Sequence, residues 1–87
     1  MTIHDIISEI KSLETDSTRK SVFDINRILQ NNKVLLLKHI DKDALLPIIN
    51  QFDNFTQASH KEYTSESFVL DYQKNYNLLM YYFNKIG

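Results

Sequence analysis

The chain has 87 residues, a formal net charge of −1 and 43% hydrophobic residues, values typical of a globular domain and too apolar for a disordered chain. One glycine, one proline and no cysteine exclude disulfide frameworks, thiolate metal sites and glycine-rich phosphate loops. At this length we expect one domain, residues 1–87, without the cleft of a two-domain enzyme.

An apolar stripe at helical spacing begins near the N-terminus. Thr2 and Asp5 match a capping box, with aspartate in place of glutamate, and predict the start of a helix. The stripe follows at three- and four-residue steps: Ile3, Ile6, Ile7, Ile10 and Leu13. A polar cluster at residues 15–18 interrupts the pattern, so the first helix is expected to end before it.

A second amphipathic helix is expected after this cluster. It should begin between Asp16 and Thr18 and run to about Gln30, because the asparagines at 31–32 favour a stop. Its predicted buried residues are Val22, Ile25 and Leu29.

The segment from Lys33 to Ile40 contains four consecutive aliphatic residues. Such a short run fits either a buried strand or a helix that is buried on most sides. We favour the helix, because no other segment of the sequence could supply a partner strand.

Asp41 and Asp43 are candidate N-caps for the next helix. Pro47 limits where that helix starts, because a proline is expected only in the first turn. The apolar face of this helix is expected to consist of Ile48, Ile49, Phe52 and Phe55. The polar stretch 56–67 either holds a turn or continues the helix, since it contains no glycine or proline.

The C-terminal helix has the clearest periodicity. Thr64 or Ser65 would cap it, and Glu66 is favourably placed in its first turn. Its predicted buried seam has spacings of 3, 4, 3, 4 and 3: Val69, Tyr72, Tyr76, Leu79, Phe83 and Ile86. Together these patterns predict an all-α fold, a compact bundle of four to five helices.

No residue pattern predicts catalysis. Ser59 and His60 are only neighbours in sequence, and no glycine elbow presents a nucleophile. His39, Asp41 and Asp43 carry ligand atoms for a divalent ion, but their spacing is not that of a known site, and helix capping explains the aspartates. We therefore expect no enzyme activity, no bound metal and no cofactor.

The last helix offers one candidate surface for a partner. It is apolar on almost all sides between residues 78 and 83, so it either lies at the centre of its own bundle or docks against another molecule. Tyr81 falls opposite the seam, with Leu78 and Tyr82 on one flank, and these three side chains would anchor a partner chain.

The second helix offers the other surface. Opposite its apolar side lie Lys20, Phe23, Arg27 and Gln30, and Lys33 and Lys38 would extend this stripe. Residues 19–42 carry a net charge of +4, whereas the flanking segments carry −3 and −2. A basic stripe that contains an aromatic ring suits phosphate contacts and base stacking, or the charged rim of a protein interface.

Three hypotheses follow. The first is a non-catalytic protein-binding module, for example a phage or mobile-element inhibitor (anti-CRISPR-like or another anti-defence factor) of a larger host protein or ribonucleoprotein; an immunity protein or regulatory subunit fits equally well. The second is a small RNA- or DNA-contacting module. The third is a homodimer that uses the Tyr81 surface. The sequence lacks a signal-peptide pattern and a membrane-spanning run, so we expect a cytoplasmic protein without membrane contact.

Overall fold

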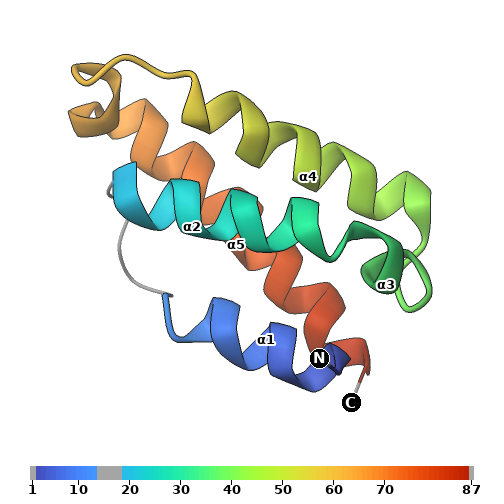
Figure 1. Cartoon of the computed structure of the whole chain (residues 1–87). Coiled ribbons are helices and arrows are strands. Elements are labelled where there is room, and N and C mark those ends of the chain that lie inside the picture. The colour runs from blue at the N-terminus through green and yellow to red at the C-terminus, as the bar shows by residue number, and fades with distance from the viewer. Residues whose placement is uncertain (1, 14–18, 87) are drawn as a thin grey trace.

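The computed structural model describes residues 2–13 and 19–86. This described part of the chain forms five α-helices, one 3₁₀ helix (η1) and no strand (Figure 1). The radius of gyration is 12.4 Å, close to the value of about 12 Å expected for a compact chain of this length. The predicted all-α bundle is confirmed. Among the described residues, no helix is both long and apolar enough to cross a lipid bilayer.

Helix α1 (Ile3–Lys11) begins at the predicted capping box. The Asp5 N–H donates to the Thr2 hydroxyl oxygen at 3.3 Å, and the Asp5 carboxylate accepts from the Thr2 N–H at 3.0 Å. The hydrogen bond from the Thr2 backbone holds the pKa of Asp5 below its ordinary value of 3.8, because it favours the charged carboxylate. The four predicted isoleucines are buried, whereas Leu13 lies beyond the helix and is only partly buried.

Helix α2 (Arg19–Asn31) buries Val22, Ile25 and Leu29 as predicted. Its buried face also includes Ser21 and Ile28, which sequence periodicity did not single out. The predicted start between residues 16 and 18 lies outside the described residues. The end of the helix agrees with the prediction to within one residue.

Helix α3 (Lys33–Leu37) confirms that the aliphatic run is helical. The expectation that this helix is buried on most sides was wrong: Leu36 is buried, but Val34 is 74% exposed. Successive residues of a helix point about 100° apart, so four in a row cannot all face one core. The run therefore places one large aliphatic side chain in solvent.

Helix α4 (Lys42–Thr56) begins after Asp41, whose side chain makes no capping hydrogen bond. Its predicted apolar face, Ile48, Ile49, Phe52 and Phe55, is buried. The expectation that Pro47 lies in the first turn was wrong, because the helix begins at Lys42 and places Pro47 in its second turn. A proline there has no N–H to donate to the carbonyl of Asp43. The helix tolerates it because Pro47 lies on the exposed side.

A turn, not a continuous helix, joins α4 to the last helix, α5 (Glu66–Ile86), and contains η1 (Glu62–Thr64). The buried Tyr63 hydroxyl donates to the carbonyl of Phe55, and burial raises the pKa of this phenol, which keeps it protonated as a donor. The Ser65 hydroxyl oxygen accepts from the Phe68 N–H at 3.2 Å, so Ser65 caps α5 as one of the two predicted candidates.

The buried seam of α5 differs from the prediction at its two ends. Tyr72, Tyr76, Leu79 and Phe83 are buried as expected. Val69 and Ile86 are only partly buried, and the neighbouring Phe68 takes the first position of the seam. Phe68 is drawn inward by aromatic packing, since its ring lies 5.1 Å from that of Phe55 and 4.6 Å from that of Tyr63.

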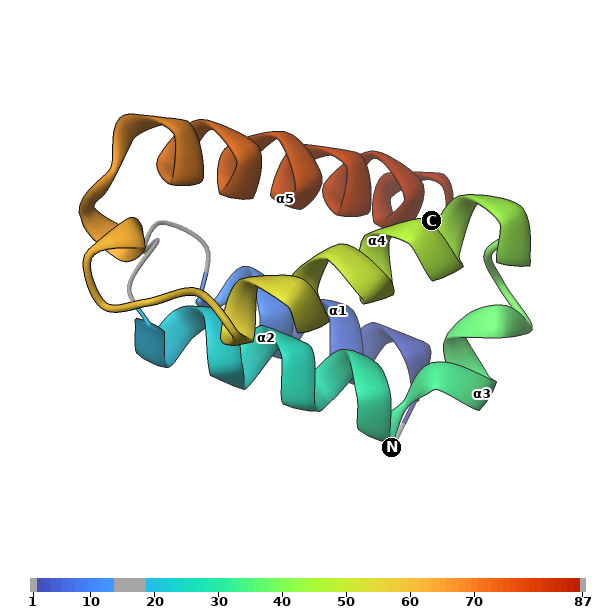
Figure 2. The same ribbon diagram turned by 90° about the horizontal axis from the view of Figure 1, so that it is seen from above.

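Helix α4 lies between α2 and α5, and it packs against both (Figure 2). Helix α1 packs against α2 and closes the core from the opposite side to α4 (Figure 1). Rings at the junction of α4 and α5 meet edge to face, with the centroids of Phe52 and Tyr72 6.0 Å apart. This arrangement leaves the outer sides of α2 and α5 without a covering helix.

Replacing Pro47 with alanine should stabilise the protein. The new N–H can bond to the Asp43 carbonyl and the ring no longer crowds it, so we expect the free energy of unfolding to rise by about 1–3 kcal/mol. Urea denaturation followed by circular dichroism measures the change. Asn50→Ala, at an exposed position of the same helix, is the control and should gain less than about 1 kcal/mol. An unchanged or lower stability of Pro47→Ala would contradict this account of α4.

The Asp5 carboxyl should titrate below 3.8 in the folded protein. A pKa that is lower in the folded than in the unfolded chain means that this group stabilises the fold above its unfolded pKa. That stabilisation is lost as the pH falls through the folded pKa. NMR titration of the carboxyl carbon, folded and in urea, measures both values. A folded midpoint at or above the unfolded one would show that the capping box does not form.

Candidate interaction surfaces

The first surface is the α2 stripe, which we define as Lys20, Phe23, Arg27 and Gln30 together with Lys33 at the start of α3. The four residues on α2 are exposed, as the helical spacing predicted, and the Phe23 side chain is 40% exposed. Lys33 is partly buried, and Lys38 lies exposed just beyond α3. The four α2 residues therefore lie together on one exposed side of that helix.

An acidic residue that flanks this stripe, Asp24, changes its character. The Asp24 carboxylate lies 3.7 Å from the Lys20 ammonium and 3.5 Å from the Arg27 guanidinium. Asp24 is thus one turn away from each cation and pairs with both. Because the two pairs share one carboxylate, the stripe is a mixed-charge surface and not a purely basic one.

Phe23 is held in place by a second cation. The guanidinium of Arg19 lies over the Phe23 ring, 5.3 Å from its centroid. This contact spans one helical turn and covers part of the ring while leaving the rest open to solvent. Arg19 therefore shares the exposed side of α2 with the Phe23 ring.

The second surface is the α5 face, which we define as Leu70, Leu78 and Tyr81. These residues are 57%, 40% and 53% exposed; Leu70 and Tyr81 lie on the side of α5 opposite its buried seam, and Leu78 lies on one flank. They line a shallow hollow together with Gln73, Lys74 and Asn77. Of the two alternatives that the sequence left open, a central helix or one with an exposed apolar side, the structure shows the second, with Tyr81 exposed. Helix α5 is accordingly not surrounded by the bundle, although its sequence is apolar on almost all sides.

Tyr82 and Lys85 support Tyr81 from two directions. Tyr82 is partly buried against the core, and its ring meets that of Tyr81 edge to face at 5.3 Å. The Lys85 ammonium lies over the Tyr81 ring, 4.4 Å from its centroid. The Tyr81 side chain raises the pKa of Lys85, so this ammonium stays charged at neutral pH. Tyr82 thus positions the anchor and contributes less exposed surface than the sequence suggested.

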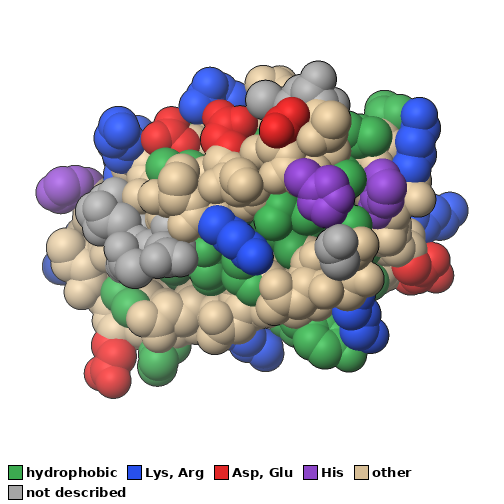
Figure 3. All heavy atoms as spheres, turned by 90° about the horizontal axis from the view of Figure 1, so that it is seen from below, with side chains coloured by type: hydrophobic (Ala, Val, Ile, Leu, Met, Phe, Trp, Pro, Cys, Tyr) green, Lys and Arg blue, Asp and Glu red, His purple; other side chains and the backbone are tan. Residues whose placement is uncertain are grey.

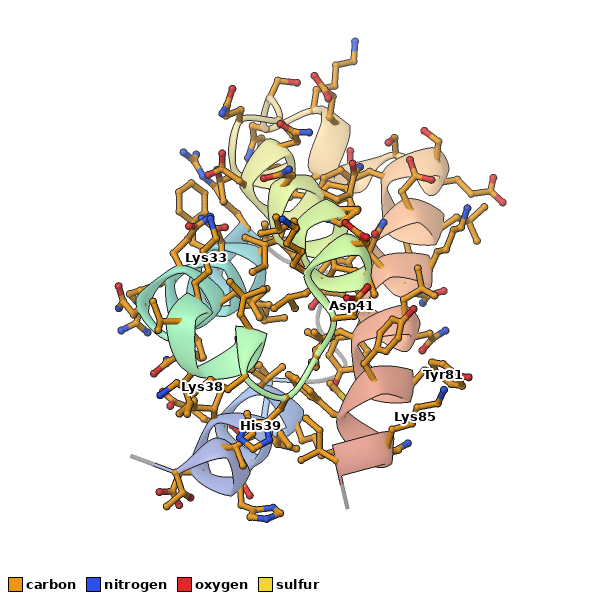
Figure 4. The ribbon with its side chains drawn as sticks, turned by 90° about the vertical axis from the view of Figure 1, so that its right-hand side faces the viewer. Lys33, Lys38, His39, Asp41, Tyr81 and Lys85 are labelled. Atoms are coloured by element: carbon orange, nitrogen blue, oxygen red, sulfur yellow. The ribbon has the colours of Figure 1, made fainter. Side chains whose placement is uncertain are left out.

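The two surfaces face away from each other. Figure 4 shows Lys33 and Lys38 on one side of the bundle and Tyr81 and Lys85 on the opposite side. The eight residues predicted to bind a partner therefore fall into two separate groups, with α4 between the helices that carry them. A single flat partner surface cannot contact both groups at once.

The other candidates from the sequence are dispersed. Figure 4 shows the His39 imidazole well separated from Asp41. Within residues 2–13 and 19–86, no three His, Asp or Glu side chains gather into a group that could hold a metal ion. On the face over α1, basic side chains are scattered among acidic and polar ones (Figure 3). The described residues on that face form no continuous positive patch in this view.

Sequence reasoning missed three groups that shape the two surfaces: Arg19, Asp24 and Lys85. Each lies three or four residues from its partner on the same helix, the spacing at which helical side chains meet. The sequence could therefore have predicted these contacts from the three- and four-residue spacings along each helix. The net charge of a whole segment does not contain this information.

The Asp24 pairs should order the stripe without stabilising the fold. The Lys20 and Arg27 side chains are 88% and 62% exposed, and such exposed pairs are worth less than about 1 kcal/mol because water and salt screen them. Asp24→Asn should therefore change the free energy of unfolding by less than that amount. Leu29→Ala, on the buried side of the same helix, should cost about 2–5 kcal/mol. If urea denaturation shows that both variants lose the same free energy of unfolding, the Asp24 pairs stabilise the fold and this prediction is wrong.

Comparison of the chain with known protein families, with curated proteins and with solved structures finds no significant match. Its function is therefore inferred from the chemistry and geometry of the two surfaces.

Proposed function

We propose that this protein is a non-catalytic helical module that binds a larger protein through the α2 stripe. The observation that carries the proposal is that Asp24, beside the stripe, pairs with both Lys20 and Arg27. A surface on which charges of both signs surround an exposed aromatic ring is complementary to a protein surface of mixed charge.

Asp24 also argues for protein over nucleic acid. A phosphate backbone gains affinity from unpaired cations that release counterions, and a carboxylate between two cations weakens that gain. The chain as a whole has a net charge of −1, whereas nucleic-acid-binding domains are commonly basic. The alternative function, contact with RNA or DNA through Lys20, Arg27, Lys33 and Lys38, is therefore the less favoured one.

Phe23 is the proposed anchor. Aromatic and arginine side chains contribute most of the binding energy at many protein interfaces, and the α2 stripe offers both. Arg19 lies over the ring and restricts its motion before binding. Less conformational entropy is then lost when the ring enters a pocket on the partner.

The concrete form that we propose is a cytoplasmic inhibitor encoded by a phage or mobile element, an anti-CRISPR-like or other anti-defence factor that acts on a host nucleic-acid-processing protein. Small size, the lack of cysteine chemistry and a residue usage rich in Asn, Lys, Ile and Tyr support it. An immunity protein or a small regulatory subunit would use the α2 stripe in the same way. None of these roles requires a metal or a cofactor.

Phe23→Ala should weaken binding to the partner by about thirtyfold, the loss typical of an interface hot spot. The tagged protein recovers the partner from its native host, and isothermal titration calorimetry with the purified partner measures the dissociation constant. Leu70→Ala removes an apolar side chain of similar exposure from the opposite side of the molecule and is the matched control. It should leave the affinity unchanged. A larger loss for Leu70→Ala than for Phe23→Ala would assign partner binding to the α5 face.

The nucleic-acid alternative predicts a different response. Fluorescence anisotropy with labelled single- and double-stranded DNA and RNA measures binding between low and physiological salt. Under the proposal, Asp24→Asn strengthens any weak residual binding, because it frees two cations. Tight binding by the wild type that falls steeply with salt and is lost in the Lys20→Glu variant would overturn the proposal in favour of an RNA or DNA ligand.

A further inference from the structure

The outer side of α5 carries a row of residues with symmetric spacing. The row consists of Glu66, Leu70, Lys74, Asn77, Tyr81 and Lys85. The intervals between successive members are 4, 4, 3, 4 and 4 residues, the same series in both directions along the helix. All six are exposed, and the four central ones line the shallow hollow on this helix. We call these six residues the α5 row.

Charge along the row is separated by sign. The acidic member, Glu66, lies in the first turn of α5, and the two basic members, Lys74 and Lys85, lie in its middle and last turn. Leu70 lies four residues after Glu66, and Tyr81 lies four residues before Lys85. Each end of the row therefore carries one large side chain and one charge at matching positions. The charges at the two ends have opposite signs.

We propose that the α5 row binds the α5 row of a second copy of this chain, with the two helices antiparallel. In that orientation Leu70 of each copy meets Tyr81 of the other, and one turn further out Glu66 meets Lys85. In the middle, the Lys74 ammonium faces the Asn77 amide oxygen, which can accept a hydrogen bond from it. A two-fold axis between the copies produces all these pairs twice.

The parallel orientation is disfavoured by the same residues. It would place Glu66 beside Glu66, Lys74 beside Lys74 and Lys85 beside Lys85, and like charges at a contact are repulsive. The antiparallel orientation also opposes the two helix dipoles. Charge and spacing thus select one orientation and one register.

The side chains at the C-terminal end of the row contact one another and their neighbour Tyr82. Lys85 lies along the helix over the Tyr81 ring, and Tyr82 supports that ring from its edge. Figure 4 shows Tyr81 and Lys85 pointing away from the bundle on the side opposite Lys33. Pairing through α5 therefore leaves the α2 stripe of both copies open, and it does not depend on the function proposed for that stripe.

An interface made of one helix from each copy is small, so the association is weak and depends on concentration. Sedimentation equilibrium of the full chain at low salt, from micromolar to millimolar concentration, tests it. We expect the average mass to rise from 10.3 kDa toward twice that value. Tyr81→Ala should weaken the association about tenfold or more. A mass that stays at 10.3 kDa over the whole range would overturn the proposal.

A charge exchange tests the orientation. Lys85→Glu and Glu66→Lys should each weaken the association about tenfold, because each replaces two attractive pairs by two repulsive ones. The double variant should return to within about threefold of the wild type. Lys20→Glu, on the opposite side of the molecule, makes the same charge change as the control and should have no effect. Association that the double variant does not restore would overturn the antiparallel register.

Discussion

The packing of α4 between α2 and α5 is the contact on which the rest of the structure depends. Helix α4 presents apolar residues to both neighbours, and its rings meet those of α5 edge to face. Because α4 separates the two helices, their outer sides point in opposite directions (Figure 2). Each outer side is therefore free to carry its own exposed large side chains, Phe23 on α2 and Tyr81 on α5, while the core beneath remains closed.

The two outer sides differ in how their charges are arranged, and this difference suggests different occupants. On α2 the cations share the carboxylate of Asp24 across the stripe, so charges of both signs are mixed around Phe23. On α5 the charges are separated along the helix, with Glu66 at one end and Lys85 at the other. The mixed charges of α2 fit the different protein that we propose as its partner, whereas the opposite charges at the two ends of α5 fit the antiparallel second copy that we propose.

Helical periodicity was sufficient to predict the all-α fold and most of the core, because burial follows the 3.6-residue repeat directly. It failed where tertiary packing or backbone chemistry decides the outcome. Phe68 replaces Val69 in the seam because rings of α4 and η1 attract it, and no local pattern contains that information. Pro47 lies inside a helix because its exposed position makes the missing hydrogen bond tolerable. Helical spacing also predicted which residues of α2 are exposed, but Asp24 and Lys85, which pair with residues of the two candidate surfaces, were not identified as part of them.

The two ends of α4 are secured very differently. Near its end, the Phe55 carbonyl accepts a hydrogen bond from the Tyr63 hydroxyl, and several aromatic rings pack around this junction. Near its beginning, the Asp41 side chain makes no cap and Pro47 leaves the Asp43 carbonyl without its amide. Local opening starts where backbone bonds are fewest, so within α4 we expect the first turns to exchange their amide hydrogens sooner than the last turns.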